Sequence, residues 1–143
     1  MPKVAATGYR QDPLYARIAS ATQDVSRRGP VVTPVDVLIT MGLLTRERLE
    51  NWRRGRVPYL ERVINCNLAR LARVLRILRF QAEELGLKPS FTVYMRWGKG
   101  PKARLRFTKT GDPNLEEAYA THFVGRRTEP LSRPVSEEGA SAP

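Results

Sequence analysis

The sequence predicts an α+β fold that is mainly helical, with one β-hairpin, in a single domain. Apolar residues recur at helical spacing up to Gly86, and the spacing changes to two residues from Phe91 onward. With 143 residues, 41% of them hydrophobic and 27% charged, the chain has the size and composition of one globular domain. We expect a basic domain over residues 12–124, between a disordered arm (1–11) and a disordered tail (125–143).

Start and stop signals predict three helices in the first part of the chain. They span residues 13–29, 35–41 and 45–54. Asp12-Pro13 and Thr33-Pro34 each combine a capping side chain with a proline at the first helical position, and Thr45 caps the third helix. Gly29 and Gly42 end the first two helices, because glycine readily adopts the left-handed conformation after a helix.

The longest predicted helix begins at Pro58 and ends at Gly86. Its leucines repeat at helical spacing and form a face broad enough to cover a core, so we expect it to be the central element of the domain. A last short helix is capped at Asp112-Pro113 and runs to about Thr121.

A β-hairpin is predicted between these two helices. Phe91, Val93, Met95 and Trp97 lie on one side of an alternating segment. We expect Trp97, in phase with Phe91 and Val93, to belong to the core. The Gly-rich turn at residues 98–102 leads into a returning strand that carries alternating arginines.

The net charge of +11 is concentrated in the middle of the chain. Residues 46–109 contain 17 of the 25 Lys and Arg residues but only five acidic residues, which gives this segment a net charge of +12. Such a basic field attracts nucleic acid, an anionic membrane or an acidic protein, and charge alone does not choose among them. Because no stretch reaches the length of a membrane span, we expect no membrane partner.

Two short helices that meet at Gly42, the second of them rich in arginine, have the order of a helix-turn-helix. Residues 33–64, with Trp52-Arg53-Arg54-Gly55-Arg56-Val57-Pro58 near their centre, resemble phage-repressor-type helix-turn-helix DNA-binding domains. In that family the second helix lies in the major groove of DNA. The resemblance implies base contacts from Arg46, Glu47, Arg48 and Asn51 and phosphate contacts from Arg53, Arg54 and Arg56. An ordinary helical hairpin with an Arg-rich surface would show the same pattern.

The long helix carries a second basic set at intervals of three residues: Arg70, Arg73, Arg76 and Arg79. A planar guanidinium can bind two phosphate oxygens at once, and no acid occurs between Glu61 and Glu83 to pair with these charges. We therefore favour phosphate binding. Two alternatives stay open: acids elsewhere, such as Glu116 and Glu117, could neutralise the stripe, and Ile77 and Phe80 could bury part of it against the hairpin or a second subunit.

The hairpin carries the third basic set: Arg96, Lys99, Lys102, Arg104 and Arg106, with Lys109 after them. Beside the helix pair, it resembles the wing of winged-helix proteins, a basic hairpin that contacts the phosphate backbone. Tyr94 and Trp97 would stack on bases if the partner were single-stranded RNA.

No motif in the sequence indicates catalysis. The single Cys66 excludes an intrachain disulfide and a multi-cysteine zinc site, and the single His122 excludes a multi-histidine metal site. The Gly98-Lys99-Gly100 turn lacks the length and the Lys-Ser/Thr ending of a P-loop. We expect no enzymatic activity, no cofactor and no metal. The single cysteine and the absence of an apolar run in the first residues favour a cytoplasmic location.

The sequence therefore predicts a non-enzymatic nucleic-acid-binding protein, with DNA favoured over RNA and transcriptional regulation as the role that the resemblance implies. An RNA- or ribosome-associated protein would use the same charges. A protein-interaction module would instead use the Arg/apolar face of the long helix, notably Ile77 and Phe80. A homodimer or another protein partner also stays open.

Overall fold

The computed structural model describes residues 8–125, and the expected α+β class is confirmed. The α-helices are α1 (Tyr15–Arg28), α2 (Pro34–Thr40), α3 (Arg46–Arg53), α4 (Leu68–Glu84) and α5 (Pro113–Ala120). Two short 3-10 helices are η1 (Tyr9–Gln11) and η2 (Leu60–Val63), and the strands are β1 (Val31–Val32), β2 (Lys88–Phe91) and β3 (Thr121–Val124). Most of the predicted arm and tail, residues 1–7 and 126–143, lies outside the described residues.

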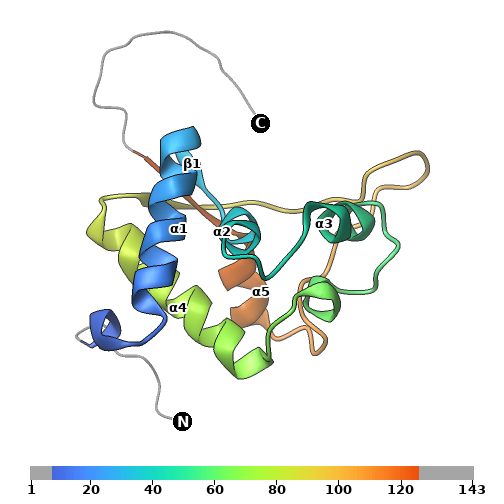
Figure 1. Ribbon diagram of the computed structural model, residues 1–143. Helices are drawn as coiled ribbons and strands as arrows, with labels where there is room; N and C mark the ends of the chain where they lie inside the picture. The colour runs from blue at the N-terminus through green and yellow to red at the C-terminus, as the bar shows by residue number, and fades with distance from the viewer. Residues whose placement is uncertain (1–7, 126–143) are drawn as a thin grey trace, which may run out of the picture.

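The core lies between α1, α2, α4 and α5. In Figure 1, α1 and α4 cross on one side of the molecule, and α3 lies at the opposite end. Ile18, Leu38, Leu78 and Tyr119, one from each core helix, are completely or almost completely buried. Burial of each such side chain contributes about 1.5–3 kcal/mol to stability.

A small antiparallel sheet joins segments that are distant in sequence. Its strand order is β1-β3-β2, so β3 lies in the centre. Phe123 of β3 is opposite Val32 of β1 on one side and opposite Pro89 of β2 on the other. The prediction missed β1 and β3. Thr121–Val124, which follows α5 directly, is the central strand of the sheet.

The predicted helix from Pro58 to Gly86 is wrong in its first part. Only residues 68–84 are α-helical, and Asn67 caps this helix by accepting a hydrogen bond from the Arg70 backbone N–H at 2.8 Å. Upstream, the Leu60 and Glu61 N–H groups donate to the carbonyls of residues 106 and 107, at 3.2 and 2.9 Å. Because the backbone there bonds to a distant segment, it cannot form the helical ladder.

The predicted hairpin forms only a short pairing. Met95 and Arg104 make an isolated antiparallel bridge, and the Arg96 N–H donates to the Ala103 carbonyl at 2.8 Å. The extended segment starts earlier than predicted, at Lys88, because residues 88–91 pair with β3 instead of with the returning strand. The expectation for Trp97 is also wrong, because it is exposed together with Phe91 and Val93.

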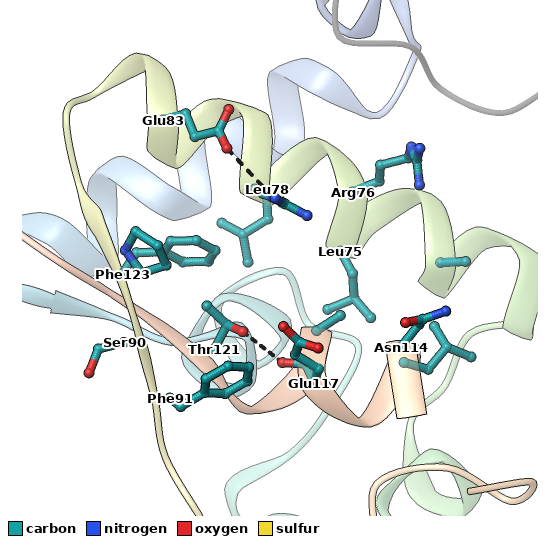
Figure 2. Close-up of a pocket in the computed structure, with 15 residues that line it drawn as sticks. Leu75, Arg76, Leu78, Glu83, Ser90, Phe91, Asn114, Glu117, Thr121 and Phe123 are labelled. Atoms are coloured by element: carbon teal, nitrogen blue, oxygen red, sulfur yellow. Dashed lines mark hydrogen bonds and ion pairs between the residues drawn. The ribbon is translucent and has the colours of Figure 1, made fainter. Parts of the chain in front are cut away.

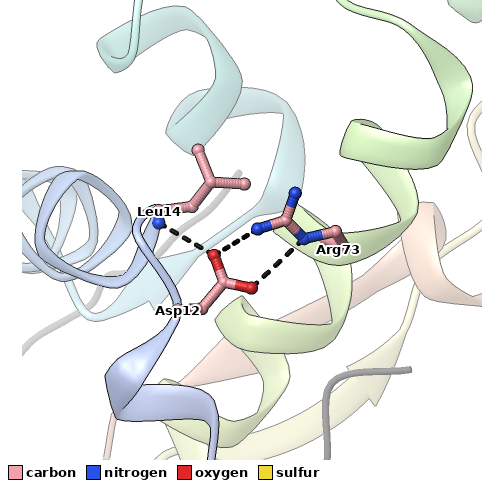
Figure 3. Close-up of polar contacts among 3 residues, drawn as sticks. All are labelled: Asp12, Leu14 and Arg73. Carbon is pink, nitrogen blue, oxygen red and sulfur yellow. Dashed lines mark hydrogen bonds and ion pairs between the residues drawn. The ribbon is translucent and has the colours of Figure 1, made fainter. Parts of the chain in front are cut away.

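The start of the domain also differs from the prediction. Residues 8–11, expected in the arm, form the turn and 3-10 helix around the buried Tyr9, whose ring lies 5.2 Å from that of Phe80. Asp12 accepts hydrogen bonds from the Leu14 N–H and from the Arg73 guanidinium on α4 (Figure 3). The beginning of α1 is thereby fixed to the middle of α4.

Candidate nucleic-acid interface

Helix α3 and the hairpin pack against each other at one end of the molecule (Figure 1). The Trp97 N–H donates to the Arg53 carbonyl at 2.6 Å, and the indole N–H of the buried Trp52 donates to the Arg106 carbonyl at 2.7 Å. The Trp52 and Phe107 rings lie 5.0 Å apart. The first and third basic sets, which are separated in sequence, therefore lie on adjoining elements.

Arg53 is half-buried between two aromatic rings. Its guanidinium lies 4.9 Å from the Tyr94 ring centroid and 4.7 Å from that of Trp97, within the range of cation–π attraction. Its Nε is buried without a hydrogen-bond partner, and burial lowers the pKa of Arg53. This arginine joins α3 to the hairpin and is not placed as an open phosphate ligand.

Two of the predicted hairpin arginines also hold the chain in shape. Arg96 donates to the carbonyls of Lys99 at 2.8 Å and Pro101 at 3.1 Å, so its guanidinium organises the turn. Its side chain lies over Gly55, where an added Cβ would be 2.7 Å from Arg96 Cδ. Arg106 donates to the Thr108 carbonyl at 3.1 Å and to the Lys109 carbonyl.

We use the name α3–hairpin surface for the exposed cations on these two elements and on the turn after α3. Its members are Arg46, Arg48, Arg54, Arg56, Lys99, Lys102 and Arg104. Two acids of α3 reduce its charge, the exposed Glu47 and the half-buried Glu50. The Asn51 side chain is already bonded within the protein, since its Oδ1 accepts a hydrogen bond from Arg56 at 3.2 Å.

The α4 arginines do not form one continuous open stripe. Arg73 is bound by Asp12, with side chains that are 21% and 11% exposed, so its guanidinium is already paired within the protein (Figure 3). Arg79 pairs with Glu83 at 3.5 Å, which is one helical turn further along. Arg70 is exposed on the first turn of α4. Helix α4 packs against α1 and α5, whereas α3 packs against η2, so the second basic set has different neighbours from the first.

Arg76 and Arg79 line a groove between α4, β2 and α5 (Figure 2). The groove has a volume of about 640 Å³, and Leu75, Leu78 and Phe123 form part of its apolar wall. Glu83 and Glu117 line it as well, so side chains of both charges surround the groove. On the predicted interaction face of the long helix, Ile77 is fully buried and the partly buried Phe80 packs on Tyr9.

The titratable groups near the hairpin form a local hydrogen-bond network. His122 Nε2 and the Tyr94 hydroxyl share a hydrogen bond of 2.8 Å, and His122 Nδ1 lies 3.2 Å from Thr92 Oγ1. Burial lowers the pKa of His122 and raises that of Tyr94 to about 12. Burial also raises the pKa of the half-buried Cys66 thiol. Within residues 8–125, no group of three or more His, Cys, Asp or Glu side chains is arranged to hold a metal ion.

No family model, curated protein sequence or solved structure matches this chain. None of the helices in the described part of the chain is long and apolar enough to span a membrane.

Proposed function

We propose that this chain is a non-enzymatic nucleic-acid-binding protein whose phosphate contacts come from the α3–hairpin surface. The packing of α3 against the hairpin supports this most directly, because it gathers exposed Arg and Lys side chains from two separate parts of the sequence. Binding would be driven by the release of counterions from the phosphates. Arg53, between two aromatic rings, and Arg96 and Arg106, which bond to backbone carbonyls, would hold this surface in place without contacting the ligand.

DNA is the first choice of ligand in this proposal. The helices α2 and α3 keep the order of the helix-turn-helix, with Gly42 at a φ of +81° in the turn and with Arg46 and Arg48 exposed on the second helix. Regulation of transcription is the role that this resemblance implies. We also propose a cytoplasmic location, on the basis of the single cysteine.

Binding of a labelled oligonucleotide, followed by fluorescence anisotropy across a salt series, tests the proposal. Duplex DNA, a single strand and a structured RNA are compared. If all seven cations of the surface contact phosphates, the slope of log K against log[salt] for duplex DNA reaches about −6. Absence of binding to all three ligands at low salt would refute the function, and salt-independent binding would refute the electrostatic mechanism.

A pair of charge-matched variants locates the interface. Lys102→Ala/Arg104→Ala removes two exposed cations from the α3–hairpin surface, and Arg27→Ala/Lys88→Ala removes two exposed cations from α1 and β2. We expect the first variant to weaken binding and to reduce the magnitude of the salt slope by about 2, because each lost phosphate contact changes the slope by about 0.9. Equal losses in the two variants would show that net charge, and not this surface, determines binding.

A further inference from the structure

The segment from Lys88 to Trp97 exposes a row of apolar side chains. It runs extended across the molecule in Figure 1, from the sheet to the hairpin beside α3. Phe91 is 66% exposed, Val93 53% and Trp97 40%. Three large exposed apolar residues, one at the end of β2 and two in the segment that follows it, are more than the scattered exposed side chains found on most protein surfaces.

The opposite side of the same segment is firmly attached, and this attachment fixes which side chains point outward. Thr92 Oγ1 lies 3.2 Å from His122 Nδ1, and Tyr94 packs its ring 5.2 Å from that of Phe107. The Tyr94 hydroxyl is bonded to His122. Because side chains alternate along an extended chain, the inward positions of Thr92 and Tyr94 place their neighbours on the outer side.

The Trp97 end of the row adjoins the basic surface. The Arg53 and Arg54 guanidinium groups lie 4.7 and 5.9 Å from the Trp97 ring centroid. Lys99 and Lys102 follow in the turn. A ligand that covered the row at Trp97 would therefore meet positive charge immediately beside it.

We infer that the row Phe91, Val93 and Trp97 is a stacking surface for unpaired bases of a single-stranded nucleic acid whose phosphates lie on the α3–hairpin surface. The Phe91 and Trp97 rings can stack on bases, Val93 adds apolar contact between them, and the neighbouring Arg and Lys side chains attract the phosphates. A duplex could not use the row in this way, because its base faces are covered by stacking. Phe91 and Trp97 are about 20 Å apart at the rise of an extended strand, enough for several nucleotides. This inference rests on the proposed function and adds a single-stranded ligand to the duplex.

Tryptophan fluorescence tests the inference directly. Of the two tryptophans, Trp52 is fully buried and Trp97 is exposed, so a stacked base would quench Trp97 alone. The full-length chain is titrated with a 20-nucleotide thymidine strand, a uridine strand of equal length and a duplex of equal length. We expect quenching by at least one single strand and not by the duplex; the two single strands distinguish DNA from RNA.

Three variants complete the experiment. Phe91→Ala and Trp97→Ala should each weaken single-strand binding roughly 5- to 100-fold, as expected for loss of one stacked base, and should change duplex binding less than twofold. Phe91 does not contact Arg53, so its variant remains informative if Trp97→Ala disturbs the fold. Leu85→Ala, at a residue 43% exposed just after α4, is the control and should change neither.

The outcomes separate this inference from the proposed function. Duplex binding without quenching by either single strand would overturn the inference and leave the proposed function standing. Single-strand binding that is unaffected by both aromatic substitutions would also overturn it, and would leave the row open to a protein partner. Absence of binding to all three ligands would refute both.

Discussion

Removal of the Asp12 carboxylate should destabilise the protein strongly, although Asp12 lies far from the candidate interface. Its Oδ1 accepts hydrogen bonds from the Leu14 N–H at 2.9 Å and from Arg73 at 2.5 Å, and its Oδ2 accepts one from Arg73 Nε at 3.1 Å. The two bonds from Arg73 attach the beginning of α1 to α4, the two helices that form one side of the core, and the bond from Leu14 fixes the carboxylate to the local backbone. Asp12→Ala breaks all three.

The expected cost follows from the burial of the pair. Only 11% of the Asp12 side chain and 21% of the Arg73 side chain are exposed, so water cannot fully replace the lost contacts. Breaking a fully buried ion pair costs about 3–5 kcal/mol, and a single hydrogen bond to a charged group contributes about 1.5–3 kcal/mol. For this mostly buried pair, we expect Asp12→Ala to lower the free energy of unfolding by about 2–4 kcal/mol.

Urea unfolding followed by circular dichroism measures this change. Asp24→Asn is the matched control, since Asp24 pairs with Arg28 at 3.6 Å but both side chains are more than half exposed. We expect the control to change stability by less than about 0.5 kcal/mol. If Asp12→Ala cost no more than Asp24→Asn, the reasoning that this pair fixes α1 to α4 would be refuted.

The pH dependence gives a second measure of the same contact. The hydrogen bonds from Arg73 lower the pKa of Asp12 in the folded state. The stabilisation is therefore complete above the ordinary aspartate pKa of about 4 and is lost as the pH falls through the lower folded-state value. Asp12→Ala should remove this part of the acid sensitivity, and an unchanged acid profile would contradict the assignment.

Two further predictions concern the hairpin and its surroundings. Gly55→Ala should destabilise the protein by about 1–3 kcal/mol in thermal unfolding, because Gly55 has a φ of +80° and an added Cβ would meet Arg96. Gly42→Ala is the control, and it should destabilise the protein less, because Gly42 has a similar φ but open space around it. Burial lowers the pKa of His122 in the folded state, and the charge of Asp36 offsets only part of this shift. The unfolded chain therefore binds the proton first, and the protein should lose stability as the pH decreases below about 6.5. In the His122→Gln variant, the melting temperature should change less between pH 7.5 and pH 5.5 than in the unmodified protein. An equal change with pH in both proteins would contradict this assignment.

Three helix starts could be predicted because a capping side chain acts within three residues, whereas α1 begins at Tyr15 and not at the predicted Pro13, with no side-chain bond from its N-cap residue Leu14. Thr33, Thr45 and Asp112 accept hydrogen bonds from the N–H groups of residues 36, 48 and 114, as their positions before Pro or a helical segment indicate. The sheet could not be predicted in the same way. Strand β3 pairs with residues about 30 and 90 positions earlier, and no local pattern in four residues identifies such partners.

For the candidate site, the sequence predicts where the positive charge is concentrated but not how each basic side chain is placed. The sequence indicates that arginine is concentrated between residues 46 and 109, but it does not indicate which guanidinium groups bond to carbonyls, carboxylates or aromatic rings. Arg96 and Arg106 organise the hairpin backbone, and Arg73 binds Asp12. All three depend on contacts formed only when the chain folds, so a count of basic residues overestimates the cations available to a ligand.

The reversed orientation of residues 91–97 has a physical explanation that bears on function. A period of two residues leaves the two sides of a strand equivalent, and hydrophobicity alone would have buried Phe91, Val93 and Trp97. The fold buries Tyr94 instead, because its ring packs against Trp52 and Phe107 and its hydroxyl bonds to His122. Leaving the three apolar side chains in water forgoes about 25 cal/mol for each Å² that could have been buried. A ligand that covered them would recover this free energy, and for that reason the exposed side of the strand is the part of the candidate interface to test first.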